Sequence, residues 1–252
     1  MPSPVVRRLS ALGAQLQPAP PRACAVSGCR APPVIKHIVC QILRLPTVDG
    51  AKGDSGQDTL IVRVVTECGL VGFGEVEAQP EIAKAIIDAP RSFGGKKIAA
   101  SGLRVELVGE NALDHERLWN KMYRASSFYG RHAVVIQAMA GIDMALWDLK
   151  GKFFGVPLYT LLGGKTHEKL RAYASTLFAD TPEETAARGK ALVERGYSAV
   201  KFGWGPMGES AQQDEALVAA ARSGIGPDVS LLVDGERAFP VDTPAILPVF
   251  YP

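Results

Sequence analysis

Alternation of apolar and polar residues predicts three neighbouring strands early in the chain. They are Val34–Leu45, Thr59–Thr66 and, after a turn at Gly69, Leu70–Val76. Further on, apolar residues recur at helical spacing over three segments, about residues 80–89, 112–124 and 131–153. Strands that form a meander and are then followed by helices indicate an α+β domain.

After Gly164 the pattern changes to short strands that alternate with helices. The strands are expected at about residues 170–175, 199–202 and 229–234, with helices from Thr181-Pro182 to about 195 and over 210–223. This order predicts parallel strands joined by right-handed crossovers. It fits a Rossmann-like sheet as well as a (β/α)8 barrel. Since no glycine fingerprint follows the first strand, dinucleotide binding has no support.

Composition is typical of an ordinary globular protein. The 252 residues are 47% hydrophobic and 21% charged, which is enough for a packed core. A net charge of +2 gives no electrostatic case for binding nucleic acid or acidic lipid. No apolar run in the sequence is long enough to span a membrane. We therefore expect neither a nucleic-acid nor a membrane partner.

The cysteines indicate no metal site. Cys24, Cys29, Cys40 and Cys68 share no metal-ligand spacing. We interpret them as reduced thiols in a reducing compartment, which predicts a cytoplasmic location. A disulfide between Cys24 and Cys29 is the alternative, in a chain that is not rich in cysteine.

Residues 1–33 differ from the rest of the chain. The first acidic residue is Asp49, whereas four arginines precede it among prolines, alanines and serines: Arg7, Arg8, Arg22 and Arg30. Such a composition is found in transit peptides, and Arg7-Arg8 is faintly similar to a twin-arginine export signal. Prolines interrupt any apolar core of such a signal. We expect a disordered or non-homologous extension, or an over-long translation start, and assign it no function.

The most informative segment is Ala140–Gly164, which reads AGIDMALWDLKGKFFGVPLYTLLGG. Its helix is apolar nearly all round, which predicts burial between two layers, so its charged residues Asp143, Asp148 and Lys150 need partners. Gly155 ends the helix. The segment closely resembles the junction between the capping domain and the barrel in the mandelate racemase and muconate lactonizing enzyme branch of the enolase superfamily.

The resemblance implies the fold class, an α+β capping domain over residues 34–165 followed by the first part of a (β/α)8 TIM-like barrel over 166–252. It covers about residues 34–243 and includes about three of the eight barrel strands, so the barrel is expected to be incomplete. It also implies that the loop at 46–57 and the turn after Glu75 close over the active site and select the substrate.

Asp234 is the sharpest candidate for chemistry, because it ends an apolar strand and a barrel carries its reacting groups at the carboxyl ends of its strands. The strand alone leaves open a simpler role as a turn or helix-capping residue before Gly235. The resemblance implies that Asp234 is the first of three carboxylates that bind Mg²⁺, which holds the substrate carboxylate and stabilises the enediolate. Glu236 stands where relatives often carry asparagine.

Lys201 is the second candidate, and an ordinary strand-end lysine is its simpler interpretation. The resemblance implies a Lys-x-Lys pair in which the first lysine contacts the substrate carboxylate and the second is a base. Here Gly203 takes the second position and cannot accept a proton. The base would then be a histidine paired with an aspartate on later strands. One base favours dehydration over racemisation. Trp204 either lines the pocket or caps the barrel.

Two interpretations of the whole remain open. Pro248 falls inside a helix expected after Asp242, where a proline removes a hydrogen bond and clashes with the preceding turn, so the sequence does not fit the next barrel helix. In the first interpretation, the chain is a truncated or frameshifted form of a Mg²⁺-dependent acid-sugar dehydratase, whose substrate is a small hydroxy-carboxylate and which is a homo-oligomer when intact. In the second, it is an inactive fragment or pseudo-enzyme with a structural or interaction role.

Overall fold

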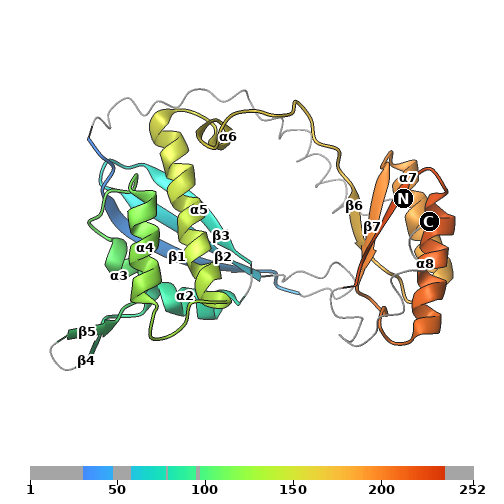
Figure 1. Ribbon diagram of the computed structural model, residues 1–252, viewed down its shortest axis with the longest axis horizontal. Helices are drawn as coiled ribbons and strands as arrows, with labels where there is room; N and C mark the ends of the chain where they lie inside the picture. The colour runs from blue at the N-terminus through green and yellow to red at the C-terminus, as the bar shows by residue number, and fades with distance from the viewer. Residues whose placement is uncertain (1–30, 48–57, 78, 95–96, 236–252) are drawn as a thin grey trace. The chain divides into compact units, whose positions relative to one another are not determined.

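The computed structural model describes residues 31–47, 58–77, 79–94 and 97–235. They fall into two compact units, the first within Met1–Pro46 and Gly56–Thr166 and the second within Thr47–Ser55 and His167–Pro252. Each unit is a small sheet with helices packed against it (Figure 1). The expected extension at 1–33 lies, up to residue 30, outside the described residues.

The sheet of the first unit is the predicted meander. Its strands pair antiparallel in the order β1 (Ile35–Arg44), β2 (Asp58–Thr66) and β3 (Val71–Val76). Along β2, every second residue is buried, and the side chains of Leu60, Val62 and Val64 are fully so. This period of two gives the sheet one apolar face, which lies in the hydrophobic core of the unit.

Within the described residues, helices and a short hairpin complete the first unit. They are α2 (Pro80–Asp88), β4 (Ser92–Gly94), β5 (Lys97–Ala100), α3 (Leu103–Leu107), α4 (His115–Ala125), α5 (Val134–Phe154) and α6 (Leu158–Leu161). The long helices α4 and α5 match the expected segments to within three residues. The hairpin, α3 and α6 were not predicted, because elements of three to five residues are too short to show a period.

Helix α5 lies directly on β3, as its nearly uniform hydrophobicity predicts. Ile142, Leu146 and Leu149 are fully buried. Of its charged residues, Asp148 accepts hydrogen bonds from the Phe73 backbone N–H at 2.8 Å and from the Lys152 ammonium at 2.6 Å. The prediction that the charges of this helix need partners is confirmed for Asp148. Gly155 ends the helix in the left-handed conformation, with φ of 68°.

The second unit has the predicted alternation of strands and helices. β6 (Ala174–Leu177), β7 (Ala199–Gly203) and β8 (Ser230–Asp234) form a parallel sheet in that order, with α7 (Pro182–Glu194) and α8 (Ala211–Ile225) between them in sequence. Thr181 caps α7 by accepting a hydrogen bond from the Glu184 N–H at 3.2 Å. The expected fold class, an α+β domain followed by three parallel strands, is confirmed.

Two expectations are wrong in detail. The first parallel strand begins at Ala174 rather than at about residue 170. Leu170 is 84% exposed, and the Arg171 guanidinium donates to the Ser198 carbonyl, so these residues lie before the ladder begins. Cys40 is a free thiol, but Cys68 is disulfide-bonded, so the four cysteines are not all reduced.

Candidate active site

Two adjacent strand ends bring the predicted site residues together. Strand β7 pairs in parallel with β8, and in this register Gly203 lies opposite Asp234. The side chains of Val200 and Phe202 are fully buried in the core of the unit, whereas Lys201 between them points to the other face. Because parallel strands end at the same edge of a sheet, the Lys201 and Asp234 side chains share one edge.

Lys201 and Asp234 form an ion pair. The Lys201 Nζ lies 2.9 Å from the Asp234 Oδ2, and the two side chains are 18% and 31% exposed. A charge-assisted hydrogen bond of this length in a partly desolvated position fixes the ammonium in place. Both residues that the sequence singled out therefore belong to one cluster, although their roles in binding remain predictions.

Gly203 stands beside this pair without a side chain. A Cβ atom placed there would lie 2.9 Å from the Asp234 Cβ and 3.0 Å from the Asp234 carbonyl oxygen. A second lysine at this position would therefore require β8 to shift. The structure offers no proton acceptor at residue 203, which is what the sequence led us to expect.

Trp204 follows in a conformation that the sequence did not reveal. Its φ is +47°, in the left-handed region that favours glycine. Its ring faces Lys201, whose Nζ lies 4.6 Å from the ring centroid. Whether Trp204 lines the pocket or caps the barrel stays a prediction; what the structure adds is the contact between its ring and Lys201.

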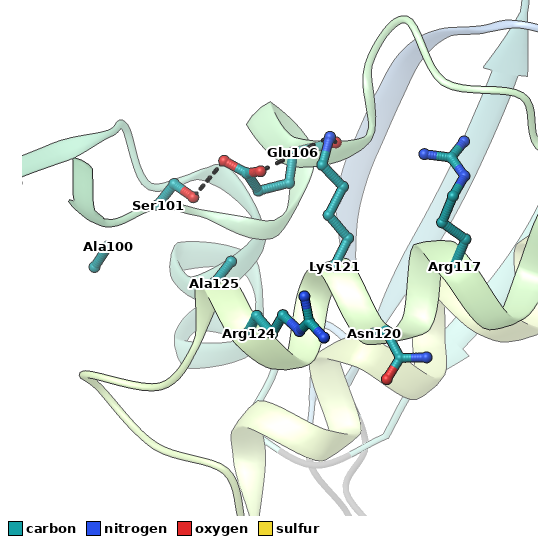
Figure 2. A pocket seen from close by; sticks show the side chains of 8 residues that line it. All are labelled: Ala100, Ser101, Glu106, Arg117, Asn120, Lys121, Arg124 and Ala125. Carbon is teal, nitrogen blue, oxygen red and sulfur yellow. Dashed lines mark hydrogen bonds and ion pairs between the residues drawn. The ribbon is translucent and has the colours of Figure 1, made fainter. Parts of the chain in front are cut away.

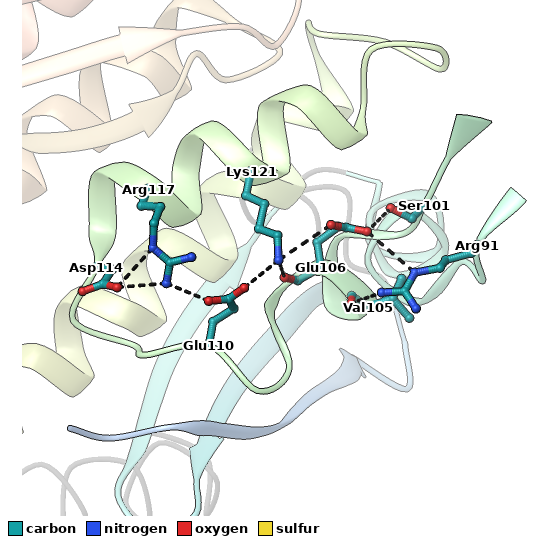
Figure 3. A network of polar contacts seen from close by, with 8 residues as sticks. All are labelled: Arg91, Ser101, Val105, Glu106, Glu110, Asp114, Arg117 and Lys121. Atoms are coloured by element: carbon teal, nitrogen blue, oxygen red, sulfur yellow. Dashed lines mark hydrogen bonds and ion pairs between the residues drawn. The ribbon is translucent and has the colours of Figure 1, made fainter. Parts of the chain in front are cut away.

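A cavity of about 640 Å³ in the first unit is a second candidate. It lies beside α4 and is lined by Ala100, Ser101, Glu106, Arg117, Asn120, Lys121, Arg124 and Ala125 (Figure 2). The one acid in this lining, Glu106, accepts a hydrogen bond from the Ser101 hydroxyl at 2.7 Å and lies 3.9 Å from the Lys121 Nζ. Figure 3 shows that the polar contacts continue from Lys121 to Glu110, which lies outside the lining. Arg117 and Lys121 bind Glu110 at 2.7 and 2.6 Å and lower the pKa of its carboxyl to about 2. This network stabilises the helix packing and presents no unpaired acid for chemistry.

The substrate-selecting loop expected at 46–57 cannot be added to either site, because residues 48–57 lie outside the described residues. The turn after Glu75 is described in part. There the Thr59 hydroxyl donates to the Glu75 carboxylate at 2.8 Å, which ties the end of β3 to the start of β2.

With this geometry in place, comparison with known proteins identifies the family. Residues 36–163 match the model of the mandelate racemase / muconate lactonizing enzyme N-terminal domain. This match covers more than half of the chain. The chain belongs to the mandelate racemase / muconate lactonizing enzyme family. The resemblance read from Ala140–Gly164 is thereby confirmed.

Relatives within this family act on acid sugars or their lactones, as their names state. The chain is 30% identical to D-galactarolactone cycloisomerase of Agrobacterium fabrum, over 72% of this chain and 45% of that protein. It is 32% identical to D-galactonate dehydratase of Pectobacterium atrosepticum, over 69% of this chain and 44% of that protein. The chain thus spans less than half of the length of these curated relatives.

A solved structure extends the likeness into the second unit. The D-glucarate dehydratase of Agrobacterium tumefaciens, crystallised with magnesium, is 27% identical, with a TM-score of 0.63 over 81% of this chain and 54% of that one. No helix in the described ranges of our chain combines the length and hydropathy that a membrane span requires.

The described residues do not by themselves form a magnesium site. In the ranges given above, no group of three or more His, Cys, Asp or Glu side chains is placed to hold a metal ion. The Asp234 carboxylate is also already bound by the Lys201 ammonium at 2.9 Å. Mg²⁺ demands near-octahedral oxygen coordination and gives up its waters reluctantly. Glu236, the nearest further acid in sequence, lies outside the described residues.

Proposed function

We propose that this chain carries part of an active site that removes water from an acid-sugar carboxylate. The observation that carries the proposal is the ion pair between Lys201, in the middle of β7, and Asp234, at the end of the adjacent parallel strand β8, with Gly203 beside it. The dehydratases among the relatives support it. In this proposal residues 34–165 are the capping domain and 166–252 the barrel portion. The proposal also includes assembly of the intact protein as a homo-oligomer.

Lys201 is the group assigned to the substrate carboxylate. Its ammonium is held by Asp234 and is only partly exposed, so it is a fixed cation rather than a mobile one. Removal of the proton next to a carboxylate turns that carboxylate into an enediolate with more negative charge. A cation already in place binds the enediolate more tightly than the substrate, and this difference lowers the barrier.

Gly203 bears on the choice of reaction. Racemisation needs proton-transfer groups on both faces of the enediolate, and residue 203 supplies none. Dehydration needs one group, which takes the proton from the carbon next to the carboxylate and then gives a proton to the departing hydroxide. The resulting enol rearranges to a 2-keto-3-deoxy acid. We therefore propose a one-base dehydratase and assign no step to a metal.

Incubation with a library of aldonic and aldaric acids in D₂O tests this proposal, and it uses the chain completed with the later barrel strands on which the base is expected. We expect a 2-keto-3-deoxy acid as product, and the Lys201→Met variant should form it at least about a hundredfold more slowly. Lys190→Met removes an exposed lysine of α7 and is the matched control, with an expected rate equal to wild type. Exchange of the α-hydrogen with inversion, and no keto product from any acid, would contradict the dehydratase assignment.

A catalytically inactive protein with a structural or interaction role is the second candidate. The observation that favours it is that, among the described residues, no group of acids or histidines is placed to hold a metal ion and the Asp234 carboxylate is already bound by an ammonium. The same incubation separates the two proposals. Neither product nor hydrogen exchange from any acid would favour the inactive protein.

The expected metal affinity of the chain follows from the same lack of metal ligands among the described residues. We expect isothermal titration calorimetry to detect no Mg²⁺ binding tighter than the millimolar range, because one ion-paired carboxylate cannot replace the waters of a hard cation. Asp234→Asn should leave the titration unchanged. Tighter binding that is lost in Asp234→Asn would show that Asp234 belongs to a complete magnesium site and would count against the inactive alternative.

A further inference from the structure

We propose that Trp204 is a positioning residue, which holds the Lys201 ammonium at the carboxyl end of β7 where an acid-sugar carboxylate arrives. The identity of that carboxylate rests on the proposed function, whereas the contact between Trp204 and Lys201 does not. The ring of Trp204 and the carboxylate of Asp234 both contact the ammonium, at 4.6 Å from the ring centroid and 2.9 Å from the Oδ2.

The backbone of Trp204 is the first observation. Its φ of +47° is one that L residues other than glycine adopt at a cost of about 1–2 kcal/mol. A glycine would adopt it freely, and a glycine lies on either side, at 203 and 205. The strain is thus borne by the residue between these two glycines, which carries a side chain. Strained residues of this kind are held by the surrounding structure and occur at functional sites.

The turn is held on both sides. On the β6 side, the Phe178 N–H donates to the Gly203 carbonyl at 3.0 Å, and a Cβ at Gly205 would lie 2.7 Å from the Phe178 carbonyl oxygen. On the α8 side, the Gly208 N–H donates to the Asp214 carboxylate at 2.8 Å, and Asp214 is only 3% exposed. These contacts fix the backbone on either side of Trp204, from which its ring reaches Lys201.

The ring and the ammonium form a cation–π contact in a partly desolvated place. Lys201 is 18% exposed, so the contact is stronger than it would be between two solvated side chains. A lysine has a long flexible side chain, and binding a carboxylate at one point requires that it be ordered. Trp204 supplies that order together with Asp234, before a substrate is bound.

Fluorine NMR tests the contact directly. The chain has three tryptophans, so 5-fluorotryptophan labelling should give three resonances, and the one lost in Trp204→Phe belongs to Trp204. We expect Lys201→Met to shift this resonance and to leave those of Trp119 and Trp147 in place. Lys190→Met is the control and should shift none. An unmoved Trp204 resonance in Lys201→Met would overturn the proposal.

The effect on Lys201 is measured by competitive labelling of the lysines with an amine reagent, followed by mass spectrometry. Trp204→Leu keeps apolar bulk without an aromatic face and should raise the labelling rate of Lys201 about threefold to tenfold. Trp204→Phe keeps a ring and should stay within about twofold of wild type. Equal rates in wild type, Trp204→Phe and Trp204→Leu would overturn the positioning role, as would an equal rise in both variants.

Binding of D-galactonate then distinguishes a failure of this inference from a failure of the proposed function. We expect D-galactonate to shift the Trp204 resonance of the wild-type protein. The dissociation constant of D-galactonate, measured by isothermal titration calorimetry because both variants lack this resonance, should rise about threefold to tenfold in Trp204→Leu but not in Trp204→Phe. If wild type binds no acid sugar of the library, the proposed function fails, while the resonance shift and the labelling rates still decide whether Trp204 positions Lys201.

Discussion

Replacing Gly74 by alanine is expected to destabilise the first unit by at least about 3 kcal/mol, enough to unfold a domain of ordinary stability. Alanine in place of a strand glycine normally stabilises a protein slightly, because it restricts the unfolded chain. Here a Cβ would lie 1.9 Å from the Gly141 carbonyl oxygen of α5, and backbone at that distance cannot yield without moving the helix. The sheet and α5 would have to separate, exposing the core between them.

Gly69→Ala is the matched control for this prediction. Gly69 lies in the turn between β2 and β3 with φ of +86°, and a Cβ there would meet nothing within 4 Å. Its substitution should cost only the strain of its backbone, about 1–2 kcal/mol. Urea unfolding followed by far-UV circular dichroism measures both variants. If Gly74→Ala costs no more than Gly69→Ala, α5 does not lie as close to β3 as the structure shows.

The periodic elements of the fold could be predicted from the sequence because burial imposes a regular pattern on them. The alternation in β2 and the helical spacing in α4 and α5 come directly from one apolar face or from burial all round. The close approach of Gly74 to Gly141 could not be predicted, because it depends on two residues far apart in sequence. The β4–β5 hairpin was missed because each of its strands is too short to show a period.

The candidate site, too, could be predicted from the sequence only in part. Lys201 and Asp234 could be brought to one edge of the sheet from their places at strand ends, since parallel strands share that edge. Their direct ion pair and the ring of Trp204 beside it depend on side-chain geometry. The left-handed backbone of Trp204 leaves no trace in the sequence, because such a conformation is usually signalled by glycine or asparagine.

The second large effect concerns His115, which the sequence did not distinguish. This residue opens α4, is only 8% exposed, and packs its ring against Trp147 with the centroids 4.4 Å apart. Neither ring nitrogen has a hydrogen-bond partner within the described ranges. Burial, reinforced by the charge of Lys150, lowers the pKa of His115 to about 4. The start of a helix also disfavours a positive charge.

A histidine with a lowered pKa makes the protein sensitive to acid. The folded pKa is about 4 and the ordinary value is 6.5, so as the pH falls the unfolded state takes up the proton first. The part of the free energy of unfolding that depends on a neutral His115 is fully present above pH 6.5 and is lost as the pH falls from 6.5 to 4. We expect the free energy of unfolding to fall by about 2–3 kcal/mol over this range through His115 alone.

His115→Gln should remove this acid loss, because glutamine is polar but does not titrate, whereas His132→Gln, which replaces an exposed histidine of the same unit, should not.

Asp143 acts in the opposite direction. Burial raises the pKa of its carboxyl, with the charge of Glu116 adding to the rise, so its protonation favours the folded state at low pH. Asp143→Asn should therefore stabilise the protein at pH 7 and steepen the loss on acidification. Urea unfolding at pH 7.5, 6 and 4.5 measures these slopes. A slope in His115→Gln that equals the wild-type slope would show that His115 does not remain neutral and buried as the pH falls.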